Sequence, residues 1–280
     1  GGLNAAIRSI FFRAKNKYNM SVFGIRNGTS GFLKRPVDYM ELKQENFSGY
    51  LLKQGGTFLG TTNKGNPFNQ ISKDGKNLDP SNEIIEGYRQ LGLEGLIIIG
   101  GDGSMQILQK LAKKGKLNIV AIPKTIDNDV GATDASIGFD TAVYVATQAL
   151  DNLHSTAVSH SRSMILEVMG RDAGHIALNA GIAGGADVIL IPEIKYSING
   201  IINKLNKMKK ENVKHSLIVV AEAVKKENGQ KVVHEFKDGQ KRLGGIGEYV
   251  SNEIMSKTDI ECRVTALGHV QRGAPPTHND

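Results

Sequence analysis

Residues 96–104 read LIIIGGDGS and residues 119–129 read IVAIPKTIDND, two apolar runs that each end in a polar turn. The runs Leu96–Ile99 and Ile119–Ile122 have the aliphatic content of buried parallel strands. In open α/β sheets the functional residues gather where such strands end. The two stretches therefore predict a parallel α/β sheet with a functional site at its carboxyl edge.

The turns carry the residue types of a phosphoryl-transfer site. Gly101 and Gly103 let backbone N–H groups approach a phosphate without interference from a Cβ atom. Asp102 lies inside the glycine turn, and Asp127 and Asp129 follow the second strand, so that carboxylates are available for a metal ion and for a proton. Because no G-x-x-x-x-G-K-[ST] segment occurs, this site is not of the P-loop type.

Apolar strands and amphipathic helices alternate along the rest of the chain, which predicts parallel sheets covered on both faces. The number of elements favours an α/β protein with two doubly wound, mainly parallel sheets and a switch between them near residues 137–140. The expected helices span residues 4–17, 82–91, 105–114, 141–153, 174–184, 198–210 and 247–256. The expected strands, besides the two above, span residues 21–25, 163–168, 188–191, 215–221 and 261–267.

The composition is that of a globular enzyme. The chain has 280 residues, of which 40% are hydrophobic, and no apolar run is long enough to cross a membrane. No signal peptide precedes the first helix, and we expect a cytoplasmic protein without a membrane partner. The single cysteine, Cys262, lies in an apolar strand-like stretch, where we expect a buried structural thiol rather than a nucleophile.

The formal net charge of +7 comes largely from lysines in helical and loop stretches. No aromatic residues alternate with these lysines as they would on a platform that stacks bases, so we do not expect a nucleic-acid partner. Two interpretations remain open: a solvated basic face, or a field that attracts small polyanionic substrates.

Polar residues also follow the later strands. They are acids, arginines, a histidine and glycines at several independent strand ends, which packing alone does not explain. They lie in Met169-Gly170-Arg171-Asp172, at Glu193 and Glu222, and in the segment 268–273, which reads GHVQRG.

Taken together, these segments resemble the 6-phosphofructokinase family, and the resemblance covers nearly the whole chain. GGDG alone is a weak signal, whereas PKTIDND followed by MGR and LGHVQRG is specific. The matching segments are LNAAIR at 3–8, GGTFLG at 55–60, GGDGS at 100–104, PKTIDND at 123–129, GFDTA at 138–142, MGR at 169–171 and LGHVQRG at 267–273.

The resemblance implies phosphorylation of fructose 6-phosphate at its 1-position, with ATP and Mg²⁺. Asp127 would be the general base, Thr125 would contact the transferring phosphoryl group and Arg171 would neutralise its charge. Asp102 would bind Mg²⁺, and Asp129 would support the metal or the base. The residues implied in nucleotide binding are Gly2, Lys64, Gly101, Asp102, Gly103, Ser104 and Lys124.

The family also implies how the sugar phosphate is bound and how the protein assembles. Glu222 would accept hydroxyl protons, and Met169 and Gly170 would supply backbone contacts and shape. The cationic residues that would hold the sugar phosphate are Arg162, Arg263, His269 and Arg272. In the family the first two reach in from a neighbouring subunit, which implies a homo-oligomer, a dimer of dimers. The implied domains are a nucleotide-binding domain, 1–137 plus about 270–280, and a sugar-phosphate domain, 138–269.

The sequence departs from the family pattern at several positions. Gly103 is typical of ATP-dependent members and Lys124 of pyrophosphate-dependent ones, so that we favour ATP and keep pyrophosphate as the alternative. Lys64 stands where many members have a nucleotide-binding arginine, and His154 stands where an effector-binding arginine is expected. The first phosphate loop is represented only by Gly1-Gly2-Leu3-Asn4, and we expect a fragment that lacks both ends.

Two other classes of function compete with this interpretation. A kinase acting on NAD or a lipid would share GGDG but should lack PKTIDND and LGHVQRG. A non-catalytic regulatory subunit would be free to lose Asp127 or Arg171, and this chain retains both.

Overall fold

A computed structural model of the chain describes residues 1–62, 67–68, 70–71, 77–235 and 241–280. The chain forms two compact units. The first contains residues 1–125, 130–137 and 280, and the second contains residues 126–129 and 138–279. The predicted switch near 137–140 therefore coincides with the last crossing from the first unit into the main part of the second.

One part of the expected division differs from the structure. Residues 270–279 belong to the second unit rather than to the first. The reason is local hydrogen bonding: the Thr277 hydroxyl donates to Asp140 Oδ2 over 2.5 Å, and the Thr277 N–H donates to Thr141 Oγ1 over 3.2 Å. Both partners lie at the start of the helix that opens the main part of this unit.

The second unit is built on a four-stranded parallel sheet in the order β12-β7-β9-β8. These strands are β7 (Ser163–Val168), β8 (Val188–Leu190), β9 (Ser216–Ala221) and β12 (Cys262–Ala266). Every residue of β7 and β9 is buried, which is why both strands are mainly apolar. Their register places Ile165 opposite both Val264 and Ile218.

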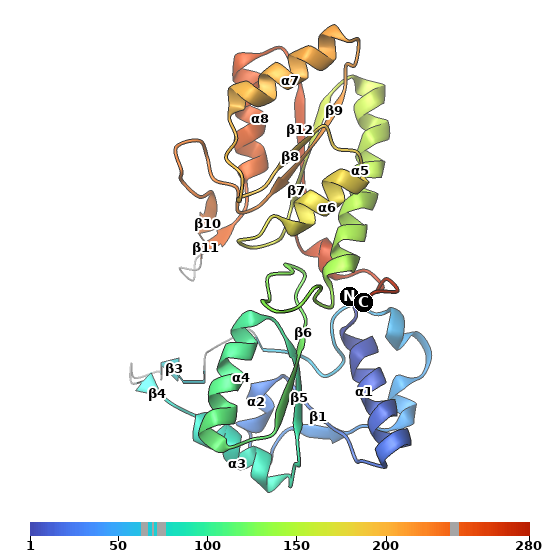
Figure 1. The fold of residues 1–280 in the computed structure, drawn as a ribbon, viewed down its shortest axis with the longest axis vertical. Coiled ribbons are helices and arrows are strands. Elements are labelled where there is room, and N and C mark those ends of the chain that lie inside the picture. Colours follow the sequence, from blue (N-terminus) through green and yellow to red (C-terminus); the bar gives the residue numbers. More distant parts are fainter. Residues whose placement is uncertain (63–66, 69, 72–76, 236–240) are drawn as a thin grey trace. The chain divides into compact units, whose positions relative to one another are not determined.

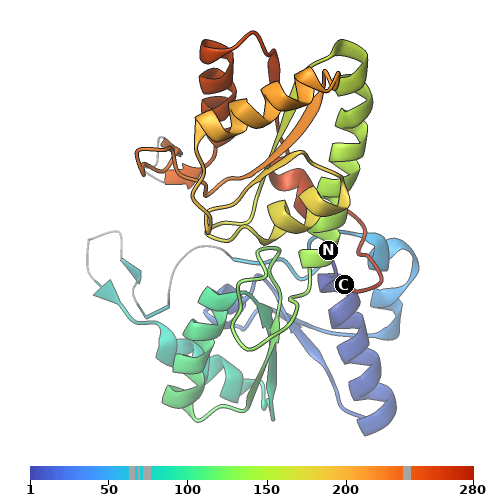
Figure 2. The same ribbon diagram turned by 45° about the horizontal axis from the view of Figure 1, so that its top comes forward.

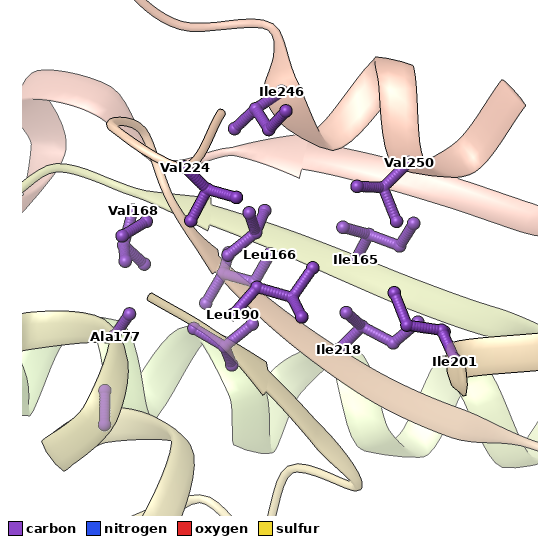
Figure 3. Packing of buried hydrophobic residues seen from close by; sticks show 14 of the residues in the cluster. Ile165, Leu166, Val168, Ala177, Leu190, Ile201, Ile218, Val224, Ile246 and Val250 are labelled. Atoms are coloured by element: carbon purple, nitrogen blue, oxygen red, sulfur yellow. The ribbon is translucent and has the colours of Figure 1, made fainter. Parts of the chain in front are cut away.

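Helices cover both faces of this sheet (Figure 1). They are α5 (Phe139–His160), α6 (His175–Ala183), α7 (Ile198–Lys210) and α8 (Ile246–Lys257). Figure 3 shows Ile246 and Val250 of α8 above the strands and Ala177 of α6 below them. Burial of the sheet between these helices produces the largest core among the described residues, to which Leu166, Ile218 and Ile198 contribute side chains with no exposed surface.

The first unit contains a parallel pair, β5 (Leu96–Gly100) and β6 (Ile119–Pro123), connected by α4 (Asp102–Gly115). Among the described residues, the unit has two further helices of ten or more residues, α1 (Leu3–Tyr18) and α3 (Ser81–Gln90). The strands are less buried than their sequence predicts: the paired residues Ile97 and Val120 are 46% and 63% exposed. Within the described part of the unit no further strand pairs with β5 or β6.

Shorter elements complete the first unit. A strand expected at 21–25 is present as β1 (Phe23–Ile25), which pairs antiparallel with β2 (Tyr39–Glu41). The remaining elements are α2 (Thr29–Phe32), η1 (Gln44–Phe47), η2 (Gly49–Lys53), β3 (Gln70–Ile71) and β4 (Asn77–Leu78). Two apolar clusters, around Leu111 and around Phe11, hold these elements together.

Three small elements of the second unit lie near the strand ends that matter for function. β10 (Val233–Glu235) and β11 (Lys241–Leu243) form an antiparallel pair that projects from the unit (Figures 1 and 2), and η3 (Gly268–Arg272) follows β12. The whole is an α/β protein with parallel sheets and helices on both faces, which confirms the predicted fold class. In the part of the chain that the structure describes, no helix combines the length and apolar character needed to cross a membrane.

Candidate active site

Glu222 is the centre of a polar cluster at the carboxyl edge of the second unit's sheet. It follows β9 directly, and its Oε1 atom accepts the N–H of Arg171 over 2.9 Å and of Gly170 over 3.3 Å. The Glu222 N–H in turn donates to the carbonyl of Val168 over 2.9 Å. The ends of two neighbouring strands are thereby joined, and the structure brings these three sequence-predicted residues together.

The surroundings of Glu222 shift the pKa of its carboxyl group. Burial raises the pKa of Glu222, and the nearby charges of Asp127 and Glu167 raise it further. The two N–H donors from Arg171 and Gly170 favour the ionised form and offset part of that shift. Asp127 also belongs to the second unit, and its charge is one of the causes that raise the pKa of Glu222.

The Met169-Gly170-Arg171 turn has positive φ angles at two residues, which suits the glycine but not the arginine. Gly170 has φ 151°, and a Cβ atom there would lie 2.5 Å from the carbonyl oxygen of Ala173, so only glycine fits. Arg171 has φ 56°, a left-handed conformation that is costly for a residue with a side chain. Its side chain is exposed, which leaves the guanidinium accessible to a charged ligand.

Met169 is held by a residue that the site prediction did not include. The Met169 N–H donates to Oε1 of Gln271 over 2.8 Å, and Gln271, on η3, is fully buried. Gln271 lies inside the LGHVQRG segment, but nothing in its spacing indicates that its side chain turns inward. His269 and Arg272 of the same element are exposed.

Asp127 and Asp129 lie in the short segment 126–129 that belongs to the second unit. Ile126 is 6% exposed and packs into the main core, which anchors the segment. Asp127 is half-buried and Asp129 is exposed. The two carboxylates of the motif therefore differ in their access to solvent.

A cavity of about 330 Å³ opens beside Glu222. Its size is in the range of small-molecule sites. Its wall includes the predicted residues Met169, Glu222 and His269, together with Glu167, His234 and Arg242, which the sequence analysis did not select. All of these residues belong to the second unit.

Glu167 is a second buried carboxylate that sequence reasoning missed. It lies in the apolar strand β7 and is only 6% exposed. Its Oε1 atom accepts the N–H of Gly245 and its Oε2 atom accepts the N–H of Gly247, both over 2.8 Å. An acidic residue inside a run of aliphatic ones is the signal that marks it, because an unpartnered carboxylate would be too costly to bury there.

The first unit carries the glycine turn. α4 begins at Asp102, three residues earlier than predicted, so that Asp102, Gly103 and Ser104 form its first turn. The N–H groups of a first helical turn have no intrahelical partner and favour anions. A Cβ atom added at Gly103 would meet no atom within 4 Å, which leaves free space beside this turn.

Asp102 has the accessibility that a metal ligand needs. Its side chain is exposed, and its Oδ2 atom accepts a hydrogen bond from Gln106 Nε2 over 2.7 Å. Mg²⁺ is typically held by one or two carboxylates together with substrate phosphates. Among the described residues no group of three or more His, Cys, Asp and Glu residues could hold a metal ion by itself, and a single carboxylate beside a phosphate-binding turn fits the magnesium of a nucleotide complex.

The other predicted nucleotide residues lie around the end of β6 and at the chain start. The Lys124 N–H donates to the carbonyl of Gly100 over 2.8 Å, which ties the two strand ends together, and the Thr125 carbonyl accepts the hydroxyl of Ser136 over 2.8 Å. Gly2 is buried, and a Cβ atom there would lie 2.5 Å from Ile137 Cγ2. Lys64 lies outside the described residues.

Arg162 and Arg263 lie at the opposite edge of the sheet from Glu222. Arg162 precedes β7 and Arg263 is the second residue of β12, so both stand where the parallel strands begin. A strand of six residues is about 20 Å long, which separates the two edges. Glu261 bridges the arginines: its Oε2 atom accepts Arg162 Nε over 2.8 Å and its Oε1 atom accepts Arg263 Nη2.

The fold and the strand-end residues define a class, the α/β phosphotransferases built from two α/β units that each contain parallel strands. A family model described as "Phosphofructokinase" matches residues 1–280. The chain belongs to this family.

Curated relatives with a phosphofructokinase name match the chain over all or nearly all of its length. It is 54% identical over 279 residues to "ATP-dependent 6-phosphofructokinase 1" of Synechocystis sp., covering 100% of this chain and 77% of the relative. A protein of the same name from Nostoc sp. is 55% identical over 272 residues, covering 97% of this chain and 75% of the relative. The predicted family is thereby confirmed.

Solved structures share the fold. Phosphofructokinase from Saccharomyces cerevisiae has a TM-score of 0.79 at 27% identity over 99% of this chain, which corresponds to 37% of the yeast chain. A pyrophosphate-dependent phosphofructokinase from Marinobacter aquaeolei has a TM-score of 0.76 at 22% identity over 99% of this chain and 68% of its own. At that identity the second likeness concerns the fold alone.

Proposed function

We propose that this chain carries the catalytic activity of an ATP-dependent 6-phosphofructokinase, which transfers a phosphoryl group from ATP to the 1-hydroxyl of fructose 6-phosphate in glycolysis. The observation that carries the proposal is the cluster at Glu222, where the predicted base, the MGR turn and a cavity of about 330 Å³ meet in one unit. Identity above 50% to relatives with that name supports the same reaction. A cytoplasmic location is part of this proposal.

Asp127 acts as the general base in this proposal. Its half-buried carboxylate takes the proton of the sugar's 1-hydroxyl as the oxygen attacks the γ-phosphorus of ATP, and ADP leaves. The exposed guanidinium of Arg171 neutralises charge that develops on the transferring group, and Thr125 donates a hydrogen bond to it. Glu222, Met169, Gly170, His269 and Arg272 bind and orient the sugar phosphate.

The first unit binds the nucleotide in this proposal. Backbone N–H groups of the turn at Gly101, Gly103 and Ser104 contact its phosphates, as do Lys124, Gly2 and Lys64. Asp102, with Asp129 in support, would hold Mg²⁺, which neutralises phosphate charge when it is bound. The open space at Gly103 accommodates the α-phosphate of ATP, which a larger side chain would crowd.

A coupled assay of the protein with fructose 6-phosphate tests the donor and the reaction together. We expect turnover with ATP and Mg²⁺ to exceed turnover with pyrophosphate and Mg²⁺, because Gly103 leaves room for the nucleotide. A preference for pyrophosphate would mean that Lys124 decides the donor. Absence of turnover with both donors would contradict the proposed function itself.

We further propose that Arg162 and Arg263 complete the site of a neighbouring subunit. They stand at the edge of the sheet that lies away from Glu222, so that they do not contribute to the cluster of their own chain. A site built from two chains requires at least a dimer, and the assembly that we propose is a dimer of dimers, which is also closed.

Mixing two inactive variants tests the shared site. Asp127→Asn and Arg162→Ala should each have little activity, and mixed subunits should regain part of it, because some interfaces then combine an intact base with an intact arginine. Size measurements establish whether subunits exchange. Exchange without any gain over the better parent would show that both residues act within one chain.

A further inference from the structure

The turn Met169-Gly170-Arg171 follows β7, the strand that lies between β12 and β9 in the sheet. On the β12 side, the Leu267 N–H donates to the carbonyl of Glu167 over 2.9 Å. In a parallel ladder every second residue of a strand bonds to the same neighbour, so Met169 is the next residue to bond on this side. Its N–H is accepted by a side chain, Oε1 of Gln271, over 2.8 Å. The amide of Gln271 thus takes the place of a strand carbonyl beyond the end of the ladder.

The β9 side of the same turn is bonded in the same manner. The Glu222 N–H donates to the carbonyl of Val168 over 2.9 Å. Oε1 of Glu222 then accepts the N–H groups of Gly170 and Arg171, over 3.3 and 2.9 Å. Three successive N–H groups of the turn are therefore accepted by two side chains, each of which follows one of the neighbouring strands.

Arg171 depends on such support because its backbone is strained. Its φ of 56° lies in the left-handed region, which is unfavourable for a residue with a side chain. A conformation of this kind persists only where the surrounding structure fixes it. The direction in which the exposed Arg171 side chain leaves the turn follows from this backbone conformation. The hydrogen bonds from Gln271 and Glu222 therefore bear on where the guanidinium lies.

Packing alone does not explain a glutamine at position 271. Its side chain has no exposed surface, and its Nε2 atom has no hydrogen-bond partner among the residues that the structure describes. A buried donor without a partner destabilises a protein, and an apolar side chain of similar length would avoid that cost. The element that carries Gln271, η3, packs against α5, which keeps the amide in place beside the turn. The acceptor oxygen, rather than the fit of the side chain, accounts for the glutamine.

We propose that Gln271 is a positioning residue for phosphoryl transfer: together with Glu222 it fixes the backbone of the Met169-Gly170-Arg171 turn, and thereby the place of the Arg171 guanidinium. This inference rests on the proposed function, in which Arg171 neutralises charge on the transferring group. Donors that are held in place stabilise a transition state well, because they need no rearrangement as charge develops. Gln271 acts through the turn and not on the substrate.

Gln271→Met tests this role, because methionine is unbranched and of similar length but offers the Met169 N–H only a weak acceptor. We expect kcat with ATP and fructose 6-phosphate to fall about tenfold, with the KM for fructose 6-phosphate within about threefold, since Arg171 acts on the transition state. Gln271→Glu keeps an acceptor oxygen for Met169 and should retain kcat within about threefold. Gln148→Met, the matched exchange at an exposed position of α5, should leave both constants unchanged.

A double-mutant cycle shows whether Gln271 acts through Arg171. In the Arg171→Ala background the guanidinium is absent, so Gln271→Met should lower kcat by less than about twofold there instead of about tenfold. A role in stability alone would lower the melting temperature of Gln271→Met and leave the kcat of the folded variant unchanged. That result, or an equal fall of kcat in both backgrounds, would overturn the inference.

Amide hydrogen exchange separates this inference from the proposed function, because it needs no turnover. In Gln271→Met the amides of residues 169–171 should exchange about tenfold faster than in the unmodified protein, while those of β7 keep their rates. If the unmodified protein does not phosphorylate fructose 6-phosphate, the proposed function fails, and the exchange rates alone decide whether Gln271 holds the turn. Equal exchange at the turn in Gln271→Met, Gln148→Met and the unmodified protein contradicts the role of Gln271 in either case.

Discussion

Glu222 combines two properties that oppose each other. Its position between two strand ends lets it accept the N–H groups of Gly170 and Arg171, and it also removes the carboxylate from water. Burial is the larger influence, and it raises the pKa of Glu222. A raised pKa means that the ionised carboxylate, which suits a hydroxyl-binding role, is less stable in the folded protein than in the unfolded chain.

The stability of Glu222→Gln should therefore depend on pH. A carboxyl group whose pKa is raised on folding contributes stability below its unfolded pKa, about 4.3, and loses that contribution as the pH rises through the folded pKa. Glutamine does not titrate and can still accept both N–H groups. We expect the melting temperature of Glu222→Gln minus that of the unmodified protein to increase from pH 4 to pH 7, as measured by calorimetry.

Glu248→Gln is the matched control, since it removes the same charge from an exposed position of the same unit. Its difference from the unmodified protein should change little over this range. A Glu222→Gln difference that stays constant or decreases with pH would contradict the raised pKa.

The residues of the candidate site differ in how visible they are in the sequence. Asp127, Glu222 and His269 follow apolar runs, so that the rule of strand ends selects them from the sequence alone. Glu167 and Gln271 were missed, because their roles depend on which way a buried side chain points. The burial of Cys262 was predicted correctly: it is 2% exposed, and burial raises the pKa of its thiol to about 11.

Helix starts in the second unit are held by glutamates that are distant in the sequence. Glu167 binds the N–H groups at the start of α8, Glu193 binds the N–H of Gly174 before α6, and Glu227 binds the N–H of Ile198 in α7. An anion at a helix N-terminus satisfies free N–H groups and interacts favourably with the helix dipole. These contacts attach three helices to loops and strands around the sheet.

Glu167→Gln should lower the free energy of unfolding by about 1–3 kcal/mol, because an amide replaces a buried carboxylate that accepts two N–H groups. One of the two acceptor atoms becomes a donor that faces the N–H of Gly245 or Gly247. Urea denaturation measures the loss. Glu248→Gln, on the exposed face of α8, should change the free energy by less than about 1 kcal/mol, and equal effects of the two variants would contradict the role of Glu167.

Some long elements were predicted with their observed bounds, whereas the longest helix, α5, was expected to end at residue 153 and ends at His160. The strand Ser163–Val168 and the helix Ile198–Lys210 have the predicted bounds, because each carries a full apolar pattern. The hairpin β10–β11 was missed, since its strands have three residues each and the side chains of Val233–Glu235 are exposed. Its turn at Gly244 and Gly245 depends on contacts with Glu167 and His234 that no local pattern records.

The path of the chain between the two units is the feature of the whole molecule that matters most for function. Neither unit is a single continuous segment, and the PKTIDND motif is divided between them, with Thr125 in the first and Asp127 in the second. The sequence indicated two units and the switch near 137–140. It did not indicate the earlier excursion at 126–129, because the burial of Ile126 in the second core depends on packing between distant segments.

The central claim is that this chain transfers a phosphoryl group to fructose 6-phosphate with Asp127 as the base, and Asp127→Asn tests it most directly. Asparagine keeps the shape of the side chain and cannot accept the proton. We expect kcat with ATP and fructose 6-phosphate to fall by about 10²–10⁴, with the KM for fructose 6-phosphate within about threefold of its original value. A variant that is folded and retains more than about a tenth of the original kcat would contradict the account.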